Sequence, residues 1–342
     1  MFATGLVIGK FLPPHRGHRL LIDTALEQAQ HVDVLVCAHP SDPIPAARRA
    51  AWLRELHPAA QVQVIETVDT EDTKVWAENT IRCLGRPPAA VFTSGEVGTT
   101  YARLMGSTHV SVDPSHERVP CSGVSVRADP LGSWEFLEPC VRAYFVRRVC
   151  VLGAESTGTT TMALALATHY DTLWVPEYVR DYWVERHSRV PGSAWQTAEF
   201  VHIALEQARR EDVLAREANR LLVCDTDAFA ACLWHERYLG CGSQKLAAIA
   251  ESRPRPDLYL LTDIDVPLEP NRPAEGRSSS GPLVRGLEQV PARDGEAPRR
   301  QMHERFCAQL ERTGRRWALL SGTHEARTEK AVALVDALLR GD

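Results

Sequence analysis

Two strand–glycine loop–helix units constrain the fold most, one beginning at Thr4 and the other at Arg147. In each unit a short apolar run leads into a loop with glycines, and helical sequence follows. Glycines let a phosphate approach the backbone, and the start of a helix carries partial positive charge. Each unit is therefore expected to open a phosphate-binding domain. Two openings in 342 residues predict two domains, 1–146 and 147–342.

Short apolar runs alternate with amphipathic helical stretches along the whole chain. The expected strands are 5–8, 32–37, 62–65, 91–93, 109–112, 148–152, 221–224, 258–261 and 317–320. The segment after Gly17 predicts a helix with one apolar face, and 194–219 predicts a long helix. Strands this short between helices indicate the α/β class, with a doubly wound parallel sheet in each domain. The Pro-, Gly-, Ser- and Arg-rich stretch 268–298 predicts a mobile surface insertion.

Composition removes several functional classes. A formal net charge of -5 gives no electrostatic reason to expect nucleic-acid binding. Neither a membrane-spanning run nor a signal peptide is visible in the sequence. The nine cysteines contain no C-x-x-C pair, so neither a disulfide framework nor a zinc site is expected. These features predict a cytoplasmic protein without membrane partners, and they leave homo-oligomer formation open.

The first candidate site is the segment G-K-F-L-P-P-H-R-G-H, from Gly9 to His18. His15 and His18, on either side of Gly17, are expected to point into one pocket. There they can donate hydrogen bonds to phosphate oxygens as charge builds during substitution at an α-phosphorus. Lys10 is expected to hold the leaving pyrophosphate as a point charge. The competing interpretation is a structural turn with incidental histidines.

This segment resembles the ATP signature of nucleotidyltransferases with an H-x-G-H motif, a Rossmann-like family. The stretches 91–96, 109–113 and 120–127 (P-C-S-G-V-S-V-R) are similar to NadR-type nicotinamide mononucleotide adenylyltransferases. The family's P-x-S-G-T-x-x-R segment has Val124 in place of its threonine, with Ser125 beside it. The ATP contacts that the resemblance implies are Gly9, Lys10, Phe11, His15, His18, Ser122 and Arg127. Some relatives carry a helix-turn-helix domain ahead of this one, and none is expected here.

The second candidate site is a phosphate-binding loop with one departure: Thr159 stands where the lysine of G-x-x-x-x-G-K-[ST] is expected. The backbone cradle survives this change, whereas the cation near the β- and γ-phosphates does not. The expected loop contacts are Gly153, Glu155, Ser156, Thr157, Gly158, Thr159 and Thr160. Thr160 is also expected to bind Mg²⁺. We hypothesise that Arg293, or one of the pair 299–300, supplies the missing cation.

The second half resembles the ribosylnicotinamide kinase domain of NadR-type proteins. The matching stretches are 153–158, 176–182, 225–227, 234–238, 263–267 and 302–306. The resemblance implies that Glu177, Arg180 and Asp227 line a riboside pocket. Asp225, at the end of an apolar strand, is the first candidate for metal binding or general-base catalysis, with Asp227 second.

The expected protein is thus a bifunctional enzyme of NAD biosynthesis and salvage, with a Rossmann-like nucleotidyltransferase domain followed by a P-loop kinase-like domain. Its expected ligands are ATP, nicotinamide mononucleotide and nicotinamide riboside, with Mg²⁺ as cofactor. Two alternatives stay open. The second domain could only bind nucleotide or riboside as a sensor, or the first could act on another phosphorylated acceptor such as pantetheine phosphate.

Overall fold

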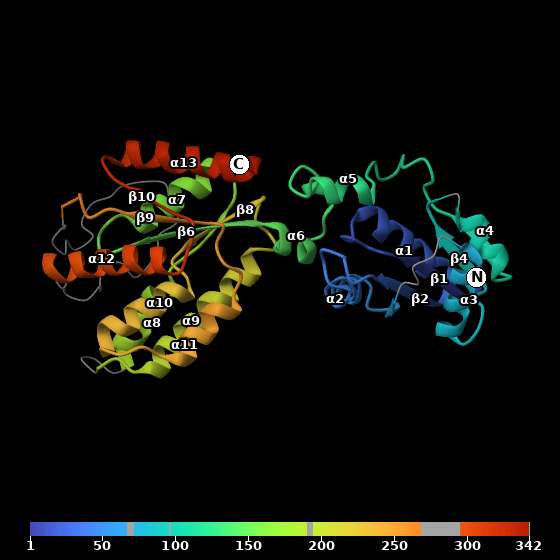
Figure 1. The fold of residues 1–342 in the computed structure, drawn as a ribbon, viewed down its shortest axis with the longest axis horizontal. Coiled ribbons are helices and arrows are strands. Elements are labelled where there is room, and N and C mark those ends of the chain that lie inside the picture. The colour runs from blue at the N-terminus through green and yellow to red at the C-terminus, as the bar shows by residue number, and fades with distance from the viewer. Residues whose placement is uncertain (67–71, 96, 190–193, 268–294, 342) are drawn as a thin grey trace. The chain divides into compact units, whose positions relative to one another are not determined.

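The computed structural model describes residues 1–66, 72–95, 97–189, 194–267 and 295–341. They form two compact units, Met1–Phe145 and Val146–Asp342 (Figure 1). Most of the expected mobile insertion, 268–294, lies outside the described residues. Its last three residues, 296–298, are helical and open a helix of the second unit.

The first unit is built on a five-stranded parallel sheet in the order β3-β2-β1-β4-β5. Its strands are β1 (Phe2–Gly9), β2 (Ala29–Ala38), β3 (Gln61–Glu66), β4 (Ala90–Thr93) and β5 (Thr108–Ser111). Its helices are α1 (Arg16–Gln28), α2 (Ala46–Leu56), α3 (Thr73–Leu84), α4 (Val97–Leu104), α5 (Gly123–Ala128) and α6 (Pro139–Phe145), with a 3₁₀ turn η1 (Trp134–Phe136).

Helices cover both faces of this sheet because successive strand residues point to opposite sides. Val7 packs with Ile22 of α1 and Leu53 of α2 in one core. Its neighbour Leu6 packs with Ala102 of α4 in a second core, together with part of α3. The central strand β1 is thus buried on both faces, which explains its continuous apolar run.

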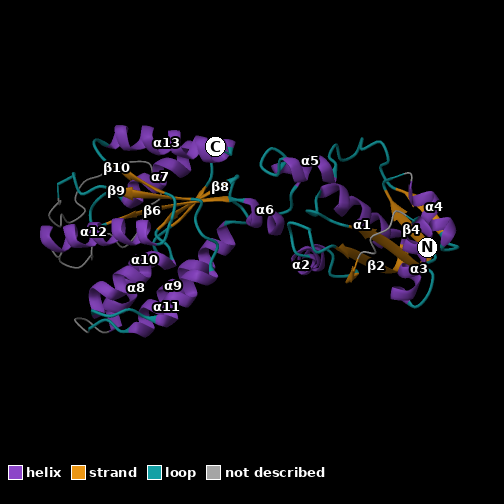
Figure 2. Ribbon diagram, viewed as in Figure 1, coloured by secondary structure: helices purple, strands orange, loops and turns teal. Residues whose placement is uncertain are grey.

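The second unit has its own parallel sheet, in the order β10-β9-β6-β8-β7 (Figure 2). Its strands are β6 (Arg147–Gly153), β7 (Leu173–Val175), β8 (Leu221–Asp225), β9 (Leu258–Thr262) and β10 (Trp317–Leu320). Its helices are α7 (Thr159–His169), α8 (Tyr178–Arg189), α9 (Thr197–Leu214), α10 (Ala228–Leu239), α11 (Gln244–Ser252), α12 (Glu296–Arg312) and α13 (His324–Arg340).

The helices of the second unit pack in two groups. The α7 and α13 helices cover one face of the sheet, where Met162 and Val335 meet Val149 and Val151 of β6. The α9, α10 and α11 helices lie side by side (Figure 1), and Phe200 of α9 is part of the core that they share. None of the helices in the described residues is long and apolar enough to cross a membrane.

The predicted fold class, α/β with two doubly wound parallel sheets, is confirmed. In each unit the first strand lies in the middle of its sheet, β1 in one and β6 in the other. The order of connection reverses beside that strand, so a crevice is expected at its carboxyl end. Both glycine loops, after Gly9 and Gly153, leave their sheets at such an end.

Candidate active sites

His15 occupies the N-cap position of α1, and its side chain takes part in the cap. The backbone N–H of Gly17 donates to His15 Nδ1 at 3.1 Å. The neutral ring therefore carries its proton on Nε2, an assignment that rests on this hydrogen bond. The His15 residue is only 5 % exposed. Its Nε2 is buried, yet it has no hydrogen-bond partner among the described residues. A buried donor without a protein partner is available to a ligand or to a water molecule.

His18 lies against His15, with 3.8 Å between the two ring centroids. Its Nδ1 is a second buried nitrogen that none of the described residues contacts by a hydrogen bond. The Phe11 ring also packs edge-on against His18, with 4.9 Å between the two ring centroids. Phe11 is fully buried, so its side chain supports His18, and any contact it makes with a nucleotide is through its backbone.

Gly17 is required by the close packing of the two histidines. A Cβ at this position would stand 2.9 Å from Cε1 of His15, closer than such atoms approach in proteins. The glycine of H-x-G-H therefore allows the imidazole of His15 to fold back over the start of α1.

Both histidines are neutral at physiological pH. Burial lowers the pKa of His15 from its ordinary value to about 4, with a smaller effect from the charge of His116. Burial also holds the pKa of His18 well below its ordinary range, and proximity to His15 lowers it further. The pair thus offers neutral N–H donors that a polyphosphate can bind.

The segment 121–127 converges on the same place. A Cβ at Gly123 would stand 3.6 Å from His15 Nε2, and Cys121 Sγ lies 3.4 Å from His15 Nδ1. Arg127 Nη1 donates to the Leu12 carbonyl at 3.4 Å. Ser122 caps α5 by accepting from the Ser125 N–H at 3.1 Å. The start of α5 therefore lies beside His15, and Arg127 contacts the loop that leads to it.

Arg49 holds the backbone of the first candidate site at Lys10, a role that no sequence motif indicates. Its side chain is 0 % exposed and forms an ion pair with Asp42 at 2.7 Å. It donates to the carbonyls of Ile44 and Cys37 at 2.9 Å each, and also to that of Lys10. The Lys10 backbone is thereby fixed, while its side chain is exposed.

In the second unit the loop after β6 has the shape of an anion cradle. Ser156 and Gly158 both have left-handed backbone, with φ of 60° and 87°. Such residues turn successive N–H groups toward one concave side, where they bind anions. Gly158 is also the N-cap of α7. Thr157 is buried, and its hydroxyl bonds the Ala154 carbonyl and Thr262 at 2.7 Å each, so this side chain is engaged within the protein.

Beside the loop, Thr160 Oγ1 donates to Asp225 Oδ2 at 2.6 Å. Burial raises the pKa of Asp225 from its ordinary 3.8 to about 7, and the charge of Glu177 adds to the rise. The Thr160 hydrogen bond and the Arg180 charge oppose it. Glu177 and Arg180 are themselves paired at 2.9 Å. The structure therefore brings four of the predicted residues together.

Asp227 is placed differently from the other predicted riboside residues. Its Oδ1 accepts from the Ala230 N–H at 2.9 Å, as the N-cap of α10. Its Oδ2 accepts from the Tyr259 hydroxyl at 2.7 Å, and Arg315 donates to that hydroxyl at 3.1 Å. Both carboxylate oxygens have partners inside the protein, which gives Asp227 a structural role, and its place in a riboside pocket stays a prediction.

Mg²⁺ usually binds one or two protein oxygens together with water and substrate phosphates. The hydroxyl of Thr160 and the carboxylate of Asp225 are donors of this kind, side by side at the loop. The described residues contain no group of three or more His, Cys, Asp and Glu that could hold a metal ion by itself. This donor set fits an ion that arrives with the nucleotide.

Comparison with known proteins gives the family. Residues 148–327, more than half of the chain, match the AAA domain family. The chain belongs to this family. The chain is also 29% identical over 307 residues to the trifunctional NAD biosynthesis/regulator protein NadR of Salmonella typhimurium. This match covers 82% of the chain and 72% of the relative. The NadR of Escherichia coli K12 is 29% identical over 306 residues, with the same coverage of 82% and 72%.

Two solved structures share the fold over nearly the whole length of the chain. A NadR protein in complex with NR superposes with a TM-score of 0.74 at 18% identity, covering 99% of this chain and 96% of that one. A NadR protein in complex with NAD and AMP-PNP gives 0.75 at 18% identity, covering 100% and 97%. The expected resemblance to NadR-type proteins is thus confirmed.

Proposed function

We propose that the first unit transfers the adenylyl group of ATP to nicotinamide mononucleotide, giving NAD and pyrophosphate. The observation that supports this most is the buried Nε2–H of His15, which has no partner among the described residues and lies beside His18 at the carboxyl end of β1. A site with such donors is suited to a polyphosphate whose charge grows during reaction.

In this reaction a phosphate oxygen of the mononucleotide attacks the α-phosphorus of ATP. The bond to the bridging oxygen breaks, and pyrophosphate leaves with the electron pair. The protein forms no covalent bond, so it acts by positioning and by stabilising charge. His15 and His18 donate to the α-phosphate oxygens, while Lys10 and Arg127 provide cations for the β- and γ-phosphates. Ser122 and the backbone of Gly9 and Phe11 complete the ATP contacts.

The second unit is proposed to phosphorylate nicotinamide riboside, which would supply the substrate of the first. The riboside hydroxyl attacks the γ-phosphorus and loses its proton to Asp225, and ADP leaves. In the metal-free protein burial raises the pKa of Asp225 to about 7, so its carboxylate can accept a proton near neutral pH. Thr160 and Asp225 would hold Mg²⁺, which when bound neutralises phosphate charge. Glu177 and Arg180 are proposed to contact the riboside.

The relatives support both activities. Two are described as trifunctional NAD biosynthesis/regulator proteins, and NadR structures contain NR, or NAD with AMP-PNP. The proposed domains, 1–146 and 147–342, each carry one of the two candidate sites. NAD salvage in the cytoplasm is the setting that these activities imply.

The acceptor of the first unit is tested by measuring pyrophosphate release from Mg-ATP with a panel of phosphorylated acceptors. Nicotinamide mononucleotide should be preferred, and His15→Ala should abolish release. The surface variant His31→Ala is the matched control and should react normally. A preference for pantetheine phosphate would overturn the proposed acceptor.

A second candidate function for the second unit is a riboside or nucleotide sensor without turnover. Thr159, in place of the loop lysine, favours this candidate because loss of one phosphate clamp is costly in rate. Binding of riboside in a calorimeter, together with an assay for ADP, distinguishes the two. Heat of binding without ADP formation would select the sensor.

A further inference from the structure

Arg299, on α12, is bound to the outer side of the phosphate-binding loop. Its side chain is nearly fully buried, at 3 % exposed. Nε donates to the Glu155 carbonyl at 3.0 Å, and Nη2 lies 3.5 Å from the Ser156 carbonyl. Nη2 also donates to the Val266 carbonyl at 2.8 Å. One guanidinium thus joins the loop to the segment after β9.

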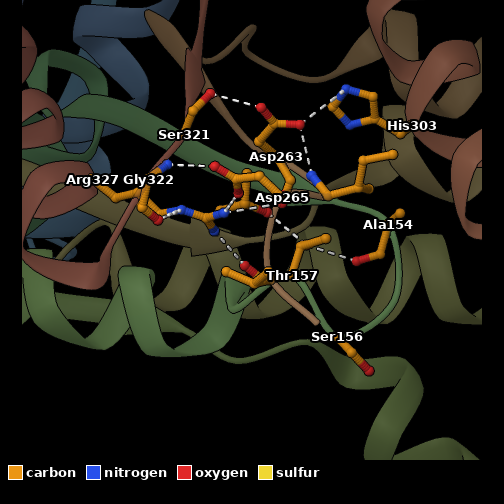
Figure 3. A network of polar contacts seen from close by, with 12 residues as sticks. Ala154, Ser156, Thr157, Asp263, Asp265, His303, Ser321, Gly322 and Arg327 are labelled. Atoms are coloured by element: carbon orange, nitrogen blue, oxygen red, sulfur yellow. Dashed lines mark hydrogen bonds and ion pairs between the residues drawn. The ribbon is translucent and has the colours of Figure 1, made fainter. Parts of the chain in front are cut away.

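Arg327, on α13, holds the next residue of the loop. Nη1 donates to the Thr157 carbonyl at 2.8 Å, and Nη2 donates to the Asp263 carbonyl at 3.1 Å and to the Asp265 carboxylate. Nε donates to the Gly322 carbonyl at 3.0 Å. Figure 3 shows this guanidinium at the centre of a network that reaches the loop at Thr157.

The two arginines together bind the carbonyls of three consecutive loop residues, 155–157. Because these loop carbonyls bind the two arginines, the neighbouring backbone N–H groups are left available to an anion on the opposite side of the loop. Ser156 is held in left-handed backbone, a conformation that persists only where its surroundings impose it. The arginines provide such surroundings.

Their counter-charges differ. Arg299 has Glu296 at 3.4 Å, a carboxylate whose side chain is 61 % exposed and therefore well screened by water. Arg327 is paired more closely, with Asp265. Arg299 therefore contributes more positive potential to the loop, and Arg327 contributes mainly position. Guanidinium groups stay charged at any physiological pH, so this potential is constant.

We propose that Arg299 and Arg327 are positioning residues that replace the missing loop lysine from the outer side of the loop. They hold its N–H groups ready for the phosphates of ATP and supply the positive potential that Thr159 lacks. This inference rests on the proposed kinase function of the second unit. In this arrangement Arg299 acts through the loop and not by direct contact with a phosphate, because its guanidinium is bound to backbone carbonyls. Of the other two candidates, Arg300 is exposed and Arg293 lies outside the described residues.

The test is the KM for ATP in riboside phosphorylation, followed as ADP so that the first unit, which releases pyrophosphate, does not interfere. Arg299→Met should raise KM for ATP about tenfold or more, since a hydrogen bond to a charged group contributes about 1.5–3 kcal/mol. KM for riboside should change little. Arg312→Met, an exposed arginine of the same helix, is the matched control. An unchanged KM for ATP in both Arg299→Met and Arg327→Met would overturn the inference.

Restoring the lysine separates electrostatics from general support. Thr159→Lys in the Arg299→Met background should recover most of the lost ATP affinity, and in the wild-type background it should change KM for ATP only slightly. Failure of that rescue would contradict a role in replacing the lysine. Should Arg299→Met not fold, Arg299→Lys keeps the charge with fewer donors. Arg299→Lys should then raise KM for ATP, and adding Thr159→Lys should reverse this rise. A rise that Thr159→Lys leaves unchanged would contradict the inference.

A binding measurement distinguishes failure of the inference from failure of the kinase proposal. Calorimetry with a non-hydrolysable ATP analogue should show two binding sites in the wild-type chain, and Arg299→Met should weaken one of them about tenfold. If the wild type makes no ADP and Arg299→Met still weakens one site in this way, the kinase proposal fails and the role of the arginines stands. A single site in the wild type, or two sites of unchanged affinity in the variant, would overturn the role of the arginines.

Discussion

Thr160 Oγ1 donates to Asp225 Oδ2 at 2.6 Å, and this bond joins the start of α7 to the end of β8. The two oxygens come from residues 65 positions apart in sequence. Asp225 is 2 % exposed, so its carboxylate is held in place and largely out of water. A buried carboxylate that costs free energy to ionise is better explained by function than by stability.

Asp225→Asn is expected to reduce ADP formation from riboside about 100-fold or more, because it removes the proposed base and metal ligand. NAD formation from the mononucleotide by the same protein should be unchanged, which makes the first unit an internal control for folding. Equal ADP formation by wild type and variant would contradict the role given to Asp225.

The same variant should alter the pH dependence of stability. The pKa of Asp225 is raised to about 7 in the folded protein, so its stabilising contribution is present at low pH and is lost as pH rises through about 7. Asn does not titrate. The melting temperature of Asp225→Asn relative to wild type should therefore be higher at pH 8 than at pH 5. Thermal unfolding at both values measures this, and a pH-independent difference would contradict it.

His15 and His18 should not titrate in the ordinary histidine range. Because their pKa values are lowered, His15 to about 4, both stay neutral as pH falls from 8 to 5. In proton NMR of the ligand-free protein, two imidazole signals that disappear in His15→Ala and His18→Ala should be constant over this range. An inflection between pH 6 and 7 in either signal would contradict neutral donors. The unfolded chain protonates first on acidification, so these residues favour unfolding below about pH 6.5.

Arg49→Met should destabilise the protein by roughly 3 kcal/mol, since it leaves Asp42 and several buried carbonyls without their cation. It should also impair adenylyl transfer, because the Lys10 backbone loses its anchor. Arg48→Met, its exposed neighbour on α2, is the control and should be near wild type in both respects. Chemical denaturation and the pyrophosphate assay measure the two effects.

Tyr259→Phe tests the structural role of Asp227. Loss of the 2.7 Å hydrogen bond should cost about 1–2 kcal/mol of stability and leave KM for riboside unchanged. Glu177→Gln should instead raise KM for riboside with little loss of stability. A raised KM for riboside in Tyr259→Phe would instead support the predicted place of Asp227 in the riboside pocket.

The elements predicted from sequence were those with strong local signals. β1 and α1 follow from a continuous apolar run and a one-sided apolar stripe, and both are present. β7 was missed because three residues, 173–175, carry too little pattern, and only pairing with β8 makes them a strand. Hydrogen bonds between distant parts of the chain decide such segments.

The sites were partly predictable for the same reason. His15 and His18 lie within one short motif, so local sequence places them together. Arg49 and Arg327 belong to no sequence motif, and only the tertiary structure brings them to backbone carbonyls. Sequence does not give the internal partners of Asp227, because they depend on left-handed Thr226, with φ of 80°, and on Tyr259 of another strand.

The most direct test of the central claim is product chromatography after incubation of the full chain with Mg-ATP and either nicotinamide mononucleotide or nicotinamide riboside. Wild type should make NAD from both, Asp225→Asn from the mononucleotide alone, and His15→Ala should accumulate the mononucleotide from riboside without making NAD. If the wild-type protein makes no NAD from the mononucleotide, the account of the first unit is wrong.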